Sequence, residues 1–212
     1  MSPVQLDRQA ITGLILAGGR GTRMGGVDKG LQPWSGRPLV WHALERIKPQ
    51  VGSVIMNANR HVEQYQQLGV AVYPDALADY PGPLAGFAVG LQEAQTPYLL
   101  TVPCDSPRFP LDLASRLAQA LQAHSADIAM VSAPETAEDG TRVLRAQPVF
   151  CLLSTHLKSS LLEFLASGQR KIDRWTGLHR TVLVPFNLAQ DDPNAFANIN
   201  TLAELNSLPS YP

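Results

Sequence analysis

The chain has 212 residues and a formal net charge of -1 at pH 7, with 45% hydrophobic and 17% charged residues. That length allows one domain with a sizeable core, and the composition is that of a folded protein rather than a disordered one. The small net charge argues against nucleic acid as a partner, so any anion site must be local. We find no apolar run of membrane-spanning length and no signal peptide in residues 1–10, and therefore expect no membrane partner.

The chain contains two cysteines, Cys104 and Cys151. They form neither a CxxC pair nor a disulfide framework of the secreted type, so both are expected to be reduced thiols in a cytoplasmic protein. The histidines and cysteines do not cluster with the spacing of a metal site. We expect the protein to be a monomer.

Short apolar runs alternate with segments of helical periodicity, with neither an internal repeat nor a linker. This pattern predicts an α/β fold in three layers, Rossmann-like, around a mostly parallel central sheet. Up to residue 102 we expect a strand at 11–17, a helix at 38–47, a strand at 51–57, a helix at 61–68, a strand at 70–73, a helix at 83–94 and a strand at 98–102. Further along we expect a helix at 111–123, a strand at 127–131, a polar loop at 133–145 with the composition of a mobile segment, a strand at 148–153, a helix at 156–166 and a strand at 181–185. A final helix is predicted after Asn200, with Thr201 as its N-cap.

Polar residues and glycines follow several of the predicted strands directly. Gly18 and Gly19 come after the first strand, Asn57 ends the second, and Asp105 follows the strand that ends at Val102. In open parallel sheets, ligands bind at the carboxyl ends of the strands. The sequence therefore predicts a ligand site at this edge of the sheet.

The segment from Leu16 to Lys29 is the strongest chemical signal. Its five glycines let the backbone take positive φ and approach a ligand closely. Successive amides in such a turn can converge on phosphate oxygens, and Arg23 and Lys29 add two cations. A solvated surface turn is the plain alternative for a glycine loop.

Two common glycine motifs do not fit this segment. A P-loop needs Gly-Lys-Ser/Thr, but Lys29 is preceded by Asp28 and followed by Gly30. The dinucleotide-binding pattern needs a third glycine where Met24 stands.

The whole string of residues 16–29 resembles the signature of molybdenum cofactor guanylyltransferases, within the nucleotidyltransferases of Rossmann-like fold. The resemblance continues in order through residues 57–60, Asp75, residues 79–86, residues 103–107 and residues 196–201. It implies a single nucleotidyltransferase domain over residues 1–212, with a nucleotide-binding part at about 11–106 and a pterin-substrate side at about 107–212. Residues 133–190 match only loosely.

The resemblance also implies roles for individual residues. Arg23, Lys29 and Asp105 match catalytic positions, and Asp105 matches the ligand of a Mg²⁺ cofactor. The GTP-binding positions are matched by Leu16, Ala17, Gly18, Lys29, Asn57, Asp75 and Asp105. Positions that shape the site or lie near the second substrate are matched by Gly19, Gly82, Gly86, Asn198 and Asn200.

The resemblance implies that GMP is transferred from GTP to the terminal phosphate of molybdopterin, or of its molybdenum complex, with release of pyrophosphate. Transient partners would be molybdopterin-synthesis proteins or molybdoenzyme chaperones. The nearest alternative is a cytidylyltransferase for the same pterin, and a more distant one is a sugar-phosphate nucleotidyltransferase. A non-catalytic GTP-binding protein is the alternative from another class.

Some residues also have plainer interpretations. Asp105 is suited to cap a helix or form a turn between two prolines, although a carboxylate after a buried strand suits a hard cation. Asn198 and Asn200 alternate along an extended segment and therefore face one side, or they cap a helix.

Overall fold

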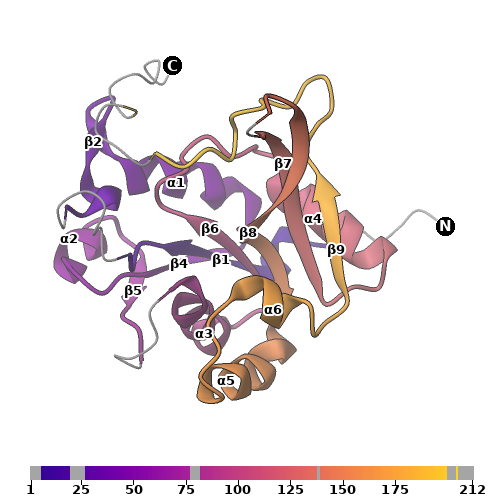
Figure 1. Cartoon of the computed structure of the whole chain (residues 1–212). Coiled ribbons are helices and arrows are strands. Elements are labelled where there is room, and N and C mark those ends of the chain that lie inside the picture. Colours follow the sequence, from indigo (N-terminus) through magenta and orange to yellow (C-terminus); the bar gives the residue numbers. More distant parts are fainter. Residues whose placement is uncertain (1–5, 20–26, 77–81, 138, 200–203, 205–212) are drawn as a thin grey trace.

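The computed structural model describes residues 6–19, 27–76, 82–137, 139–199 and 204 (Figure 1). Its centre is a seven-stranded sheet in the order β5-β4-β1-β6-β8-β7-β9. The strands are β1 (Ile11–Leu16), β4 (Ser53–Asn57), β5 (Ala71–Tyr73), β6 (Tyr98–Pro103), β7 (Ile128–Thr136), β8 (Arg142–Ser154) and β9 (Thr181–Pro185).

The sheet is mostly parallel, as predicted. β5, β4, β1 and β6 are parallel neighbours, and β7 pairs with β9 in parallel. β8 is the exception, because it runs antiparallel to both β6 and β7. The four parallel neighbours therefore place the four segments that follow them side by side at one edge.

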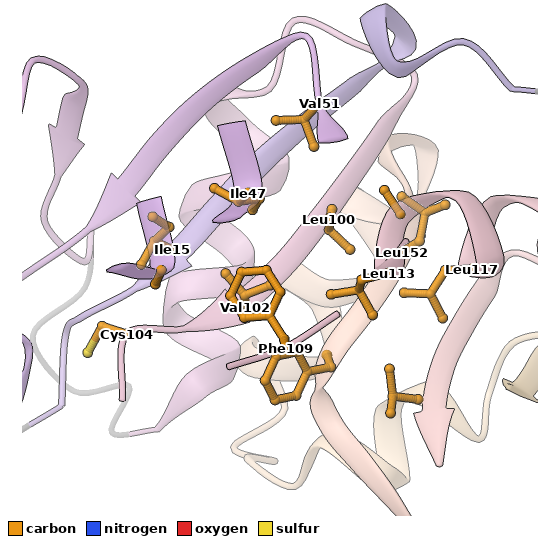
Figure 2. Close-up of a cluster of buried hydrophobic side chains, with 14 of the residues drawn as sticks. Ile15, Ile47, Val51, Leu100, Val102, Cys104, Phe109, Leu113, Leu117 and Leu152 are labelled. Atoms are coloured by element: carbon orange, nitrogen blue, oxygen red, sulfur yellow. The ribbon is translucent and has the colours of Figure 1, made fainter. Parts of the chain in front are cut away.

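Helices cover both faces of the sheet and make the three predicted layers (Figure 1). One face packs against α1 (Leu39–Ile47) and α4 (Leu113–Ala123), most of whose buried residues belong to the larger core cluster. Ile47 and Leu113 from these helices lie in it near Val102 and Leu100 of β6 (Figure 2). The other face packs against α3 (Pro83–Glu93), α5 (Lys158–Ala166) and α6 (Ile172–Thr176).

Smaller elements complete the chain. They are the short helix α2 (Val62–Gln66), the β2 (Pro33–Trp34) and β3 (Arg37–Pro38) pair, and the 3-10 turns η1 (Arg8–Ala10), η3 (Lys29–Leu31), η4 (Lys48–Gln50) and η5 (Thr155–Leu157). α2 contacts β5 at the edge of the sheet. Among the described residues, no helix combines the length and the apolar character needed to cross a membrane.

The prediction of a polar loop at 133–145 is wrong. These residues extend β7 and β8 into a long antiparallel hairpin, which pairs Val131 with Gln147 and continues to the pair Thr136 and Arg142. The register shifts between Met130 and Val131, opposite the segment that contains Pro148. A proline cannot donate to the ladder, so a bulge is the expected adjustment. Because β8 is exposed from Arg142 to Ala146, the arm lacks the apolar alternation that would identify it as a strand.

The other predicted elements are present with boundaries shifted by a few residues. β4 begins at Ser53 rather than at residue 51, and α2 is shorter than the predicted helix at 61–68. α6 and the β2–β3 pair were not predicted. The predicted final helix with Thr201 as its N-cap lies outside the described residues, apart from Glu204, which is helical. The sheet takes strands from both parts of the predicted domain, and assignment of the second part to the pterin stays a prediction.

Candidate active site

The carboxyl ends of four neighbouring strands bring most of the predicted site residues together. Within the sheet, Leu16 of β1 is paired with Asn57 of β4 on one side and with Pro103 of β6 on the other. Asn57 is in turn paired with Tyr73 of β5, two residues before Asp75. Backbone hydrogen bonds continue past the strands, from Ala17 N to Asn57 O at 2.8 Å and from Cys104 N to Leu16 O at 3.1 Å. The chain segments carrying Gly18, Asn57, Asp75 and Asp105 thus form one continuous edge.

Asp75 is held by two asparagines from the turn after β4. Asn57 Nδ2 donates to Asp75 Oδ1 at 2.8 Å, and Asn59 Nδ2 donates to Asp75 Oδ2 at 2.7 Å. The Asp75 backbone N–H donates back to Asn59 Oδ1 at 2.7 Å. Asn57 is 3% exposed, so its amide needs these partners. The arrangement fixes the orientation of the Asp75 carboxylate.

The same turn supports the start of the glycine loop. Asn59 Nδ2 donates to Gly18 O at 3.3 Å, and an Arg60 guanidinium nitrogen donates to Gly19 O at 3.2 Å. A Cβ at Gly18 would lie 2.8 Å from Asn57 Oδ1 and 2.9 Å from Asn59 Nδ2. Glycine is therefore required at position 18 by close packing against this turn.

Lys29 and Asp105 form an ion pair across the edge. Lys29 Nζ lies 3.3 Å from Asp105 Oδ2, and the two side chains are 20% and 19% exposed. They are 76 positions apart in sequence, and come from η3 and from the turn after β6. A cation beside a half-buried carboxylate at the strand ends is suited to bind a polyphosphate with its metal ion.

The C-terminal segment closes against the turn that carries Asp105. The Ile199 N–H donates to Asp105 O at 2.9 Å, and Ser106 Oγ donates to Asn198 Oδ1 at 2.6 Å. Asn198, a predicted site residue near the C-terminal end of the sequence, therefore lies beside Asp105. Its own side chain is exposed.

For the remaining predicted site residues, the structure gives little or no information about a role. Arg23 and Asn200 lie outside the described residues. Gly82 has a φ of +119° and precedes α3, a conformation that favours glycine. A Cβ added at Gly19 would have no described atom within 4 Å, so packing does not require glycine there. The role of Gly19 stays a prediction.

Similarity to known proteins identifies the family. A family model described as "MobA-like NTP transferase domain" matches residues 13–182. A molybdenum cofactor guanylyltransferase of Albidiferax ferrireducens is 59% identical over 98% of this chain and 99% of the relative. A relative of the same name from Acidovorax sp. (strain JS42) is 61% identical over 96% of this chain and 97% of its own length. The chain belongs to the family of molybdenum cofactor guanylyltransferases. It is a nucleotidyltransferase.

Solved structures agree with the fold of this family. A molybdopterin-guanine dinucleotide biosynthesis protein A from Archaeoglobus fulgidus has a TM-score of 0.71 at 19% identity, covering 92% of this chain and 95% of its own. A 4-diphosphocytidyl-2C-methyl-D-erythritol synthase from Anaerococcus prevotii has a TM-score of 0.70 at 13% identity, covering 94% and 96%. The predicted Rossmann-like α/β fold is thus confirmed.

Several residues at the candidate site were not selected from the sequence. Asn59 and Arg60 lie in the matching segment 57–60, but the sequence of that segment does not reveal their contacts with Gly18, Gly19 and Asp75. Asp28 was noted only as the residue that breaks the P-loop pattern. Its carboxylate is buried, which a sequence pattern does not reveal.

Proposed function

We propose that this chain transfers GMP from GTP to the terminal phosphate of molybdopterin, forming a guanine dinucleotide cofactor. In this reaction a phosphate oxygen of the pterin attacks the α-phosphorus of GTP, the bond from that phosphorus to the bridging oxygen breaks, and pyrophosphate leaves. The names of the 56–61% identical relatives support the reaction. The juxtaposition of Lys29 and Asp105 at the strand ends is the observation that carries it.

The attacking phosphate is already anionic, so the chain needs no nucleophile of its own. Its work is to align two anionic reactants and to offset their repulsion. From its place beside Asp105, Lys29 would bind phosphate oxygens as a point charge. Asp75, whose carboxylate is already oriented by Asn57 and Asn59, would accept hydrogen bonds from the nucleoside. Gly18 lets the nucleotide approach the backbone closely.

Magnesium is proposed as the cofactor, with Asp105 as its protein ligand. Among the described residues no group of three or more His, Cys, Asp or Glu side chains could hold a metal ion. A single carboxylate nevertheless fits Mg²⁺, which commonly takes one or two carboxylates and completes its coordination with substrate phosphates and water. When bound, the ion would supply charge stabilisation to the phosphoryl oxygens.

Isotope position provides the test of this function. The chain would be incubated with molybdopterin, Mg²⁺ and GTP labelled either at the α- or at the γ-phosphorus. We expect the α-label in the pterin dinucleotide and the γ-label in pyrophosphate. A chain that binds GTP but releases neither product would instead be a non-catalytic GTP-binding protein, and γ-label in free phosphate would indicate hydrolysis.

Three properties of the chain stay predictions from sequence. They are the cytoplasmic location, the monomeric state, and transient contacts with molybdopterin-synthesis proteins or molybdoenzyme chaperones. Guanine rather than cytosine as the base is supported by the relatives' names.

A further inference from the structure

A hydrogen-bonded cluster next to Lys29 consists of the buried Asp28 and Tyr65 and the partly exposed His61, here called the Asp28 cluster. Tyr65 Oη donates to Asp28 Oδ1 at 2.6 Å, and His61 Nδ1 lies 3.0 Å from Asp28 Oδ2. A carboxylate only accepts hydrogen bonds, so both neighbours donate to it. Asp28 is 8% exposed and Tyr65 is fully buried.

The cluster connects α2 to the segment that carries Lys29. Asp28 stands at the N-cap position of η3, yet its side chain makes no capping bond and turns inward to α2 instead. The backbone carbonyl of Asp28 accepts a hydrogen bond from Gln32 Nε2 at 3.1 Å. A buried carboxylate is costly unless it is hydrogen-bonded, so these contacts hold residue 28 firmly.

Tyr65 contacts both neighbours of Lys29. Its hydroxyl bonds Asp28, and it also lies so close to Gly30 that a Cβ on that glycine would collide with it. The same Cβ would be 3.3 Å from Cys104 Sγ, one residue before Asp105. The backbone of Lys29 is therefore fixed on both sides against the turn that carries Asp105.

Burial keeps the Tyr65 hydroxyl in its donor form. Desolvation by burial, followed by the nearby Cys104 and Asp28, raises the pKa of Tyr65 well above its usual value. His61 adopts a left-handed backbone conformation with a φ of +49°, which orients its ring toward Asp28 at the start of α2. Such a conformation is uncommon for a residue other than glycine.

We propose that Tyr65 and His61 are positioning residues for nucleotidyl transfer, which act through Asp28 to hold Lys29 at the triphosphate and Asp105. This inference rests on the proposed function, because it assigns Lys29 to the phosphates of GTP. Neither side chain needs to touch the substrate. Loss of either contact would leave Lys29 present but less well placed, and GTP would bind more weakly.

A double-mutant cycle tests whether Tyr65 acts through Lys29. Tyr65→Phe removes one hydroxyl, and GTP affinity would be measured by calorimetry in the wild-type and in the Lys29→Ala backgrounds. We expect about a tenfold loss of GTP affinity in the first background and no further loss in the second, since a contact to a charged group is worth about that much. Equal losses in both backgrounds, or no loss in either, would overturn the proposal.

A second variant guards against a folding defect. In His61→Asn the new residue also tolerates positive φ, but its side chain is shorter and no longer reaches Asp28. Because the His61 side chain is 46% exposed, the substitution should disturb the fold little. It is expected to show the same dependence on Lys29 with an unfolding temperature close to that of the wild type. If it leaves GTP affinity unchanged in a folded protein, His61 is not a positioning residue.

Ser160→Ala is the matched control. It also removes a hydroxyl that bonds a histidine, because Ser160 Oγ lies 2.9 Å from His179 Nε2, but it is on α5. GTP affinity should be unchanged. A wild-type chain that binds no GTP would overturn the proposed function and this inference together, whereas a wild type that binds GTP with an additive cycle would overturn the inference alone.

Discussion

A Cβ on Gly86 would stand 2.6 Å from Asn57 Oδ1, and would also collide with the Leu16 side chain. α3 therefore lies directly on Asn57, one of the two asparagines that orient Asp75, and only a hydrogen at position 86 allows this approach. The helix and the strand ends form one rigid support for the site.

Gly86→Ala should displace Asn57 and disturb the contact between Asn57 and Asp75. We expect a loss of unfolding free energy of about 1–3 kcal/mol from overpacking, together with weaker GTP binding. Gly90→Ala is the matched control on the same helix, because its Cβ would meet Leu14 Cδ2 at 2.5 Å and Leu99 Cδ2 at 2.8 Å in the core. It should lower stability without changing GTP affinity. Equal effects of the two variants on GTP affinity would contradict the role of Gly86.

Asp105→Asn should reduce the rate of dinucleotide formation by orders of magnitude in a folded protein. A neutral amide binds Mg²⁺ poorly, and the substitution also removes the negative charge that pairs with Lys29. Asp127→Asn is a control that removes a carboxylate paired with Arg180 at the amino end of β7, on the opposite edge of the sheet. Turnover and its Mg²⁺ dependence would be measured for both. Near-normal turnover of Asp105→Asn would show that Asp105 is not the metal ligand.

Lys29→Ala should weaken GTP binding by roughly 10- to 100-fold, since a charge-assisted bond to phosphate contributes about 1.5–3 kcal/mol. Lys48→Ala removes an equal charge from the surface, where Lys48 pairs with Glu45 at 3.2 Å, and controls for net charge. Calorimetric titration with GTP compares the two variants. An unchanged affinity for Lys29→Ala would place this lysine outside the phosphate site.

The sequence predicted the nucleotide edge better than the C-terminal half. Gly18, Asn57 and Asp105 each end an apolar run, so strand periodicity alone places them at one edge. The arm from Arg142 to Ala146 has no buried face to give it a period, so it was misread as a loop. Tyr65 resembles any apolar residue of an amphipathic helix, and its bond to Asp28 depends on a tertiary contact across 37 positions. Such long-range partners have no local signature.

An ion pair between Asp191 and Arg116 connects the C-terminal segment to α4. Arg116 donates to the two oxygens of Asp191 at 2.8 and 3.1 Å, and its guanidinium carbon lies 3.6 Å from the centroid of the Phe186 ring. Burial opposes ionisation of Asp191, but the hydrogen bonds from Arg116 and from the Leu188 N–H outweigh it and lower the pKa of the carboxyl below its usual 3.8. This ion pair holds the segment that continues to Asn198, which contacts the turn carrying Asp105.

Because the pKa of Asp191 is lower in the folded protein, its ion pair with Arg116 stabilises the fold fully above about pH 4. This stabilisation is lost as the pH falls through the pKa of Asp191 in the folded protein. Asp191→Asn should therefore lower the unfolding free energy by about 1–3 kcal/mol at neutral pH, and the difference from wild type should shrink as the pH falls below the usual carboxyl pKa of 3.8. Urea unfolding at several pH values measures this. Asp112→Asn is the control, since Asp112 is 3.8 Å from the same arginine but 58% exposed, and it should change little. A difference that does not vary with pH would contradict the account.

We infer that this edge of the sheet selects guanine for transfer to a pterin phosphate. Guanine presents N–H donors that a site must meet with oxygens, and an unpaired buried donor costs about 1–3 kcal/mol, or roughly tenfold to hundredfold in discrimination. The most direct test is a competition in which equal GTP and CTP are supplied with Mg²⁺ and molybdopterin, and the dinucleotides are identified by mass. We expect the guanine dinucleotide to exceed the cytosine dinucleotide at least about tenfold. Cytosine dinucleotide in equal or greater amount would contradict it and would place the chain with the cytidylyltransferases.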